Sequence, residues 1–243
     1  AVNLPDTLFE IGTYAFYGCT SLSSVNIPAS VRGIGALAFV GTPYYRDLSD
    51  EFTVVGDGIL LRYAPQKDGN GNLVETDHAT LIRSSSTGKA IGVSVTVPAG
   101  VHTISSAFYG TLEVTSVTLP EGVTTLSPYA FASATYLTSL TLPSTLVAIG
   151  EYAFDSCSLL SEIRLPAALG SVGAYAFVNC VSLADITLPG SLKELSPYMF
   201  SGCTRLSRVT LEEGTEKIGA YAFSEATALS EITFPSTLTS FGE

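Results

Sequence analysis

The stretch from Leu142 to Cys157, LPSTLVAIGEYAFDSC, contains the pattern on which the fold depends. Its Tyr-Ala-Phe triplet recurs with small variations, and most copies are 23 residues apart. The triplets end at Phe16, Phe39, Phe108, Phe131, Phe154, Phe177, Phe200 and Phe223. Only Phe39 and Phe108 are further apart, by three times 23 residues. A fixed period of this length is typical of a solenoid, in which each repeat buries its apolar side against its neighbours.

Each repeat also carries the pattern of a short strand. Ile163 and Leu165 alternate with Arg164, so the two apolar side chains are expected to point inward and the arginine outward. A proline follows in most repeats, and it ends a strand because it has no N–H group. Stacking the repeats then predicts a parallel sheet with strands about 4.8 Å apart.

The Tyr-Ala-Phe segments are predicted to be short helical turns. Ser127-Pro128 and Ser196-Pro197 precede two of them, and these residue types suit the N-cap and the first position of a helix. In other repeats a glycine, such as Gly150, is expected to take the cap position. The fold class expected is therefore a right-handed α/β solenoid with a parallel sheet on one face and helical turns on the other.

The 23-residue spacing, the IGxYAFxxC core and the Leu-Pro strand end together resemble the BspA-like leucine-rich repeat family of bacterial cell-surface proteins. The resemblance covers residues 1–42 and 98–243. It implies a leucine-rich repeat solenoid on the bacterial cell surface. It also implies adhesion to host matrix proteins or to other cells.

Residues 1–243 are interpreted as a single leucine-rich repeat domain whose ends fall within repeats, as in a fragment of a longer protein. Residues 43–97 depart from the repeat and are interpreted as an irregular, hairpin-containing insert within the array. Two apolar segments there surround Gly56-Asp57-Gly58, which is a hairpin signal. We expect the insert to be rich in strands and to keep the sheet continuous.

Charge and hydropathy exclude some classes of partner. The chain has 11 basic against 22 acidic residues, a net charge of −11. Binding to nucleic acid or to an anionic membrane surface needs basic residues, so neither is expected. No apolar run approaches the about 20 residues that span a bilayer, so no membrane insertion of this fragment is expected.

Cysteine and tyrosine each form a column in the repeat. Cys157 shares its column with Cys19, Cys180 and Cys203, and threonine and alanine fill the same position elsewhere. This indicates a small, semi-buried spacer, although one oxidised pair of neighbouring cysteines stays open. The tyrosine column is interpreted as a cover for the turns, with sugar binding as the alternative. Its members are Tyr14, Tyr129, Tyr152, Tyr175, Tyr198 and Tyr221.

No catalytic or metal site is expected. Residues 68–72 resemble the start of a calcium loop, but Leu73 replaces the required glycine and Ala79 the bidentate glutamate. The only histidines, His78 and His102, have no partner at metal or triad spacing. No HExxH, phosphate-loop or GxSxG motif is present. The chain is therefore interpreted as a non-enzyme without a cofactor.

The outward side of the strands is the candidate binding surface. Charged residues gather there in the later repeats, at Glu162, Arg164, Asp185, Arg208 and Glu231. Mixed charge on an extended sheet suits recognition of a macromolecular partner. The interpretation is a monomeric, extracellular module for adhesion or protein recognition, with a matrix-type host or bacterial surface protein as partner. The alternatives are a structural stalk and a carbohydrate-binding module that uses the tyrosine column.

Overall fold

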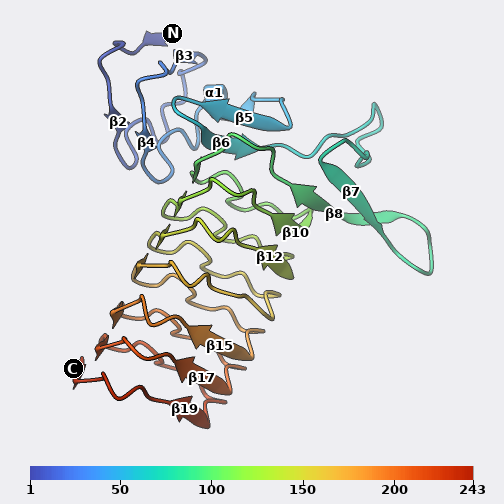
Figure 1. Ribbon diagram of the computed structural model, residues 1–243. Helices are drawn as coiled ribbons and strands as arrows, with labels where there is room; N and C mark the ends of the chain where they lie inside the picture. Colours follow the sequence, from blue (N-terminus) through green and yellow to red (C-terminus); the bar gives the residue numbers. More distant parts are fainter. Residues whose placement is uncertain (243) are drawn as a thin grey trace.

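The computed structural model describes residues 1–242, and its chain winds into a solenoid of stacked β coils (Figure 1). Strands of successive coils pair in parallel with equivalent residues in register, as Val2 pairs with Val25 and Asp185 with Arg208. The parallel sheet and the leucine-rich repeat solenoid are therefore confirmed. The right-handed sense of the coil stays a prediction.

Two columns of strands run along the solenoid. The first column contains β1 (Val2–Asn3), β3 (Val25–Asn26), β8 (Ala90–Thr96), β10 (Val114–Thr118), β12 (Ser139–Thr141), β15 (Asp185–Leu188), β17 (Arg208–Leu211) and β19 (Glu231–Thr233). Its outward side is called the strand face below. The second column, called the IG sheet, contains β2 (Glu10–Ile11), β4 (Gly33–Ile34), β6 (Ile59–Tyr63), β9 (Thr103–Ile104), β11 (Thr125–Leu126), β13 (Ala148–Ile149), β14 (Ser171–Val172), β16 (Glu194–Leu195), β18 (Lys217–Ile218) and β20 (Ser240–Phe241).

The helical turns expected at the Tyr-Ala-Phe segments are not formed. These segments are successive tight turns, in which Ala130 N donates to Ser127 O at 3.2 Å and Ala132 N to Tyr129 O at 3.3 Å. The tyrosine between these turns has a φ of +60°, a left-handed conformation that cannot continue an α-helix. The amides that a helix would use internally bond to the next coil instead, as Phe131 N does to Ala153 O at 2.8 Å.

The glycines that follow strands of the IG sheet do not act as helix caps, which was the role expected for them. A Cβ atom on Gly150 would lie 2.4 Å from Pro128 N, and one on Gly173 would lie 2.4 Å from Glu151 N. Glycine is thus required there because the backbones of neighbouring coils approach closely. The only α-helix in residues 1–242 is α1 (Pro43–Arg46), in the insert, where the hydroxyl of Thr42 caps Tyr45 N.

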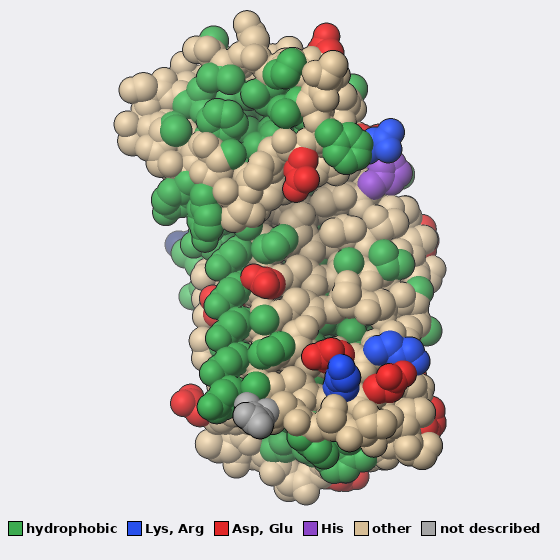
Figure 2. Space-filling view, turned by 90° about the vertical axis from the view of Figure 1, so that its left-hand side faces the viewer, with side chains coloured by type: hydrophobic (Ala, Val, Ile, Leu, Met, Phe, Trp, Pro, Cys, Tyr) green, Lys and Arg blue, Asp and Glu red, His purple; other side chains and the backbone are tan. Residues whose placement is uncertain are grey.

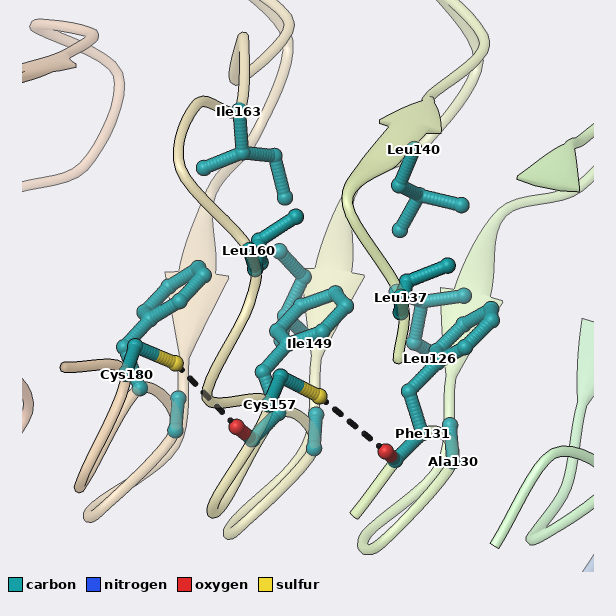
Figure 3. Packing of buried hydrophobic residues seen from close by; sticks show 14 of the residues in the cluster. Leu126, Ala130, Phe131, Leu137, Leu140, Ile149, Cys157, Leu160, Ile163 and Cys180 are labelled. Carbon is teal, nitrogen blue, oxygen red and sulfur yellow. Dashed lines mark hydrogen bonds between the residues drawn. The ribbon is translucent and has the colours of Figure 1, made fainter. Parts of the chain in front are cut away.

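The core is a stack of phenylalanine rings with one ring from each coil. Successive rings from Phe108 to Phe223 lie nearly parallel, with centroids 4.8–5.8 Å apart. Phe154 is fully buried in the middle of this stack. Figure 3 shows leucine and isoleucine side chains from the two strand columns packing around the rings. Each coil therefore completes the core of its neighbours.

The cysteine column lies beside the phenylalanine stack and carries free thiols. Cys157 Sγ donates to Phe131 O and Cys180 Sγ to Phe154 O, both at 3.2 Å (Figure 3). Cys203 Sγ makes the equivalent bond to Phe177 O at 3.1 Å. Burial raises the pKa of all three thiols, and that of Cys203 to about 12. Cys19, in contrast, is exposed.

The insert contributes the antiparallel hairpins β5 (Phe52–Val55) with β6 and β7 (Ala79–Arg83) with β8. Strand β6 pairs with β9 and so extends the IG sheet, while β8 pairs with β10 and extends the first column. The first two coils form separate two-stranded pairs, so neither sheet is continuous through the insert. The hairpin of β7 and β8 projects from the side of the solenoid (Figure 1).

Strand β6 separates two cores. Ile59 and Leu61 pack with the first two coils, whereas Leu60 and Tyr63 pack with the main array. The ring of Tyr63 stacks on Phe108 at 5.3 Å and so occupies the place of the phenylalanine in a coil. The 69 residues between Phe39 and Phe108 therefore do not form three ordinary coils, although their number equals three periods.

We expect Phe154→Ala to lower the free energy of unfolding by about 3–5 kcal/mol, since it opens a cavity in the stack and removes ring contacts on both sides. Leu159→Ala, at an exposed position of the same coil, is the control and should change stability by less than about 0.5 kcal/mol. Denaturant unfolding followed by circular dichroism measures both. Equal effects would contradict the role of the stack.

A thiol reagent such as dithionitrobenzoate should modify one cysteine of the native protein quickly. Cys19 is exposed, whereas the other three thiols are buried and have raised pKa values. All four should react in denaturant, and Cys19→Ser should remove the fast reaction. More than one fast thiol in the native protein would show that the cysteine column is accessible.

Candidate functional site

Three of the five charged residues expected on the strand face form a connected row. Asp185, Arg208 and Glu231 lie directly opposite one another in β15, β17 and β19. Arg208 Nη1 lies 3.4 Å from Asp185 Oδ1, and Arg208 Nε donates to Glu231 Oε2 at 3.0 Å. The hydrogen bond to Glu231, followed by the charges of Glu231 and Asp185, raises the pKa of Arg208.

This row contributes little to folding. All three side chains are more than half exposed, and ion pairs in such positions add little stability because water screens the charges. The pairs hold the three side chains in place without removing them from solvent. They therefore remain available to a partner as an ordered set of charges.

Glu162 and Arg164, the other two predicted residues, lie on a coil where the expected strand is absent. Ile163 between them is buried and Arg164 is exposed, in agreement with the expected directions. However, residues 162–165 do not pair with β12 or β15, so the strand predicted there is wrong. Within residues 1–242, neither Glu162 nor Arg164 forms an ion pair.

The unpaired segment is flanked by two hollows. The larger, about 440 Å³, lies toward β15 and brings Glu162, Arg164 and Asp185 together. The smaller, about 320 Å³, lies toward β12 and shares Glu162 and Arg164. Figure 1 shows this coil without a strand arrow between β12 and β15. The structure thus brings the predicted residues near one another, because Asp185 belongs both to the ion-paired row and to the lining of the larger hollow.

Leu142, Leu165 and Glu212 are among the lining residues that were not predicted as part of the site. For Glu212 the sequence does carry a signal, because it replaces the proline that ends the strand in most other repeats. Nothing in the sequence distinguishes Leu142 and Leu165 from the buried leucines of their column, such as Leu188.

The tyrosine column offers little open ring surface. Five rings from Tyr129 to Tyr221 stack with centroids 4.7–5.0 Å apart, so each inner ring has both faces against a neighbour. Burial, followed by contact with Tyr14, raises the pKa of Tyr129 to about 12. Within this row a sugar could stack only at the end, where Tyr221 is 58% exposed, and Tyr14, which lies outside the row, is 48% exposed. This arrangement supports the structural interpretation of the column.

The segment that resembles a calcium loop is a self-contained turn. Asp68 Oδ1 accepts hydrogen bonds from Asn70 N at 2.8 Å and Asn72 N at 2.9 Å, and the side chain of Asn72 also donates to the carboxylate. These bonds lower the pKa of Asp68. The carboxylate therefore stabilises the turn. No cluster of three or more metal-ligating side chains occurs in residues 1–242.

The IG sheet carries a second group of charges that the sequence analysis did not single out. Lys193 Nζ lies 3.8 Å from Glu216 Oε1, and Glu194 lies directly opposite Lys217 in the sheet. Figure 2 shows this side of the molecule, with few charges and a stripe of hydrophobic side chains along the coils. Unlike Glu162, Arg164 and Asp185, these four residues line neither of the two hollows.

No helix in residues 1–242 is long and apolar enough to span a bilayer.

Several solved structures resemble this chain. A leucine-rich repeat protein from T. pallidum is 27% identical, with a TM-score of 0.57, and the match covers 70% of this chain and 85% of that one. A leucine-rich repeat protein from Bacteroides ovatus is 25% identical, with a TM-score of 0.51 and coverage of 70% and 55%. One from Eubacterium ventriosum is 22% identical, with a TM-score of 0.58 and coverage of 98% and 55%. The last likeness concerns the fold alone.

The chain thus spans only about half the length of two of these three proteins. No curated protein matches it at a significant level. A family model described as the BspA type leucine rich repeat region matches in six copies, at residues 1–57, 89–203 and 124–243. This chain belongs to the BspA-type leucine-rich repeat family.

Proposed function

We propose that this chain is a non-catalytic, extracellular recognition module of a bacterial surface protein, and that it binds a protein partner through its strand face. The observation that carries the proposal is the group Glu162, Arg164, Asp185, Arg208 and Glu231. These residues are exposed and of both signs, and they lie along consecutive coils of one face. Membership of the BspA-type family supports the placement of the module on a cell surface.

The physical basis is preorganisation. The phenylalanine stack and the paired backbones hold the coils in fixed positions relative to one another. Binding of a partner therefore costs little conformational entropy in this chain. The charges then select a partner of complementary pattern and increase its rate of association. A matrix-type host protein or a surface protein of another bacterium has the extended surface that such a row of charges could contact.

A structural stalk is the second candidate. The observation that favours it is the continuous ring stack, which would make the array a stiff spacer between other parts of a surface protein. A stalk has no need for charges on one face. The strand-face group therefore favours recognition.

The double variant Arg164→Ala/Arg208→Ala tests the proposal against a panel of immobilised matrix proteins and glycans at low and physiological salt. We expect binding to at least one matrix protein, weakened about tenfold or more in the variant at low salt and less at physiological salt. The stability of the variant should stay close to that of the unmodified chain because both arginines are exposed.

Lys193→Ala/Lys217→Ala is the matched control, since it removes two positive charges from the IG sheet and should leave binding unchanged. An equal loss of binding in both double variants would show that binding depends on the net charge of the chain and not on the strand face. Binding to glycans that is unchanged in the arginine variant would move recognition to the tyrosine row. No binding to any member of the panel would favour the stalk.

A further inference from the structure

In the main array beyond the insert, the strand face is interrupted at a single coil. Strands β8, β10 and β12 form one ladder and β15, β17 and β19 another, and nothing pairs between β12 and β15. The residues that belong there, Glu162–Leu165, make no backbone hydrogen bond to another residue within the described chain. Both β12 and β15 consequently have an unpaired edge, and edges of this kind are templates for an added strand.

The interruption also leaves two leucines partly exposed. Leu119, Leu188 and Leu211 are buried in their column, whereas Leu142 and Leu165 of the same column are only partly buried. Leu165 lines the hollow of about 440 Å³ toward β15, and Leu142 lines the hollow of about 320 Å³ toward β12. The gap therefore combines unpaired backbone groups with an accessible apolar floor.

The rest of this coil remains attached. On its IG side, Gly170 N donates to Val147 O at 2.9 Å and Gly173 N to Ile149 O at 2.8 Å. On its turn side, Phe154 N donates to Ala176 O at 2.8 Å. The IG sheet is also interrupted on the β15 side of this same coil, where its strand β14 does not pair with β16. On the strand face this coil is thus unpaired on both sides, and in the IG sheet it is unpaired only toward β16. Its turn remains hydrogen-bonded to the next coil.

Charge around the larger hollow is unbalanced. Glu162, Asp185 and Glu212 line it together with a single base, Arg164. Arg208 beyond the hollow is already shared between Asp185 and Glu231. The rim is consequently acidic, in a chain whose net charge is −11.

We infer that the gap between Glu162–Leu165 and β15 binds an extended, basic segment of a protein partner, which pairs with the free edge of β15 and places apolar side chains over Leu165. Such strand addition takes its affinity from main-chain hydrogen bonds and its selectivity from alternate side chains. Basic side chains of the segment would meet Glu162 and Glu212. This inference rests on the proposed function of the strand face and assigns the gap one part of the partner, the basic segment, while Arg164 and Arg208 would meet acidic groups of the partner outside that segment.

The probe is a capped heptapeptide of alternating valine and lysine, titrated calorimetrically into the full 243-residue chain. Three further peptides serve as comparisons. One carries N-methyl groups on the backbone amides of its lysines and one on the backbone amides of its valines. In the third, glutamate replaces every lysine. We expect the parent peptide to bind and at least one methylated peptide to bind about tenfold more weakly or worse, because a methylated amide cannot donate. The glutamate peptide should not bind.

Hydrogen exchange locates the site. Without peptide, the amides of Glu162–Leu165 should exchange faster than the paired amides of β17, and bound peptide should slow exchange in β15 and at residues 162–165. Glu162→Lys/Glu212→Lys should abolish peptide binding. Glu10→Lys/Glu151→Lys, the same charge change at exposed positions away from the hollow, should preserve it. Equal binding by all peptides, or protection elsewhere, would overturn the inference.

The remaining outcomes separate this inference from the proposed function. Strong protection of residues 162–165 in the free protein would mean that the gap is closed, and the inference fails. If the chain binds a matrix protein through Arg164 and Arg208 but binds none of the peptides, the proposed function stands and the inference about the gap fails. If the chain binds neither a matrix protein nor a peptide, the proposed function and the inference both fail. Self-association that Glu162→Lys/Glu212→Lys removes would assign the gap to a second copy and also overturn it.

Discussion

Each coil of the main array places one buried ring against the ring of the preceding coil, and this stack is the constraint on which the structure depends. The rings from Phe108 to Phe223 are held at 4.8–5.8 Å, close to the spacing of hydrogen-bonded strands. The same translation therefore satisfies aromatic packing, the parallel ladders and the bonds between turns. A coil cannot leave this arrangement without exposing a phenylalanine or breaking backbone pairs.

The left-handed tyrosines show how this constraint overrides local preference. A φ near +60° costs a residue with a Cβ atom about 1–2 kcal/mol, yet Tyr129, Tyr152 and Tyr175 all adopt it. The conformation turns the chain tightly enough for its amides to reach the next coil. It also aligns the tyrosine rings in a row, where each stacked pair adds about 0.5–1.5 kcal/mol. Interactions between coils thus offset strain within a coil.

The strand face differs from the turn side in how it uses its side chains. Tyrosines on the turn side cover one another, and the cysteines beside the core bond to the preceding coil. The charges of the strand face stay in solvent and contribute little to stability. They meet where the ladder of the main array is interrupted, so charge, unpaired backbone and apolar surface coincide around Asp185. This coincidence makes the strand face the strongest candidate for recognition.

The sequence alone determined the solenoid, its period, the inward columns and the charged residues of the strand face, because a repeat must present the same side chain at each turn of the coil. Contacts between coils decided the rest. Tight turns replaced helices because amides such as Phe131 N bond to the next coil. Tyr63 took the place of a phenylalanine because β6 pairs with β9. Residues Glu162–Leu165 fit the repeat pattern in sequence as well as the other strands do. Only the missing pairing with the neighbouring backbones distinguishes this segment from them.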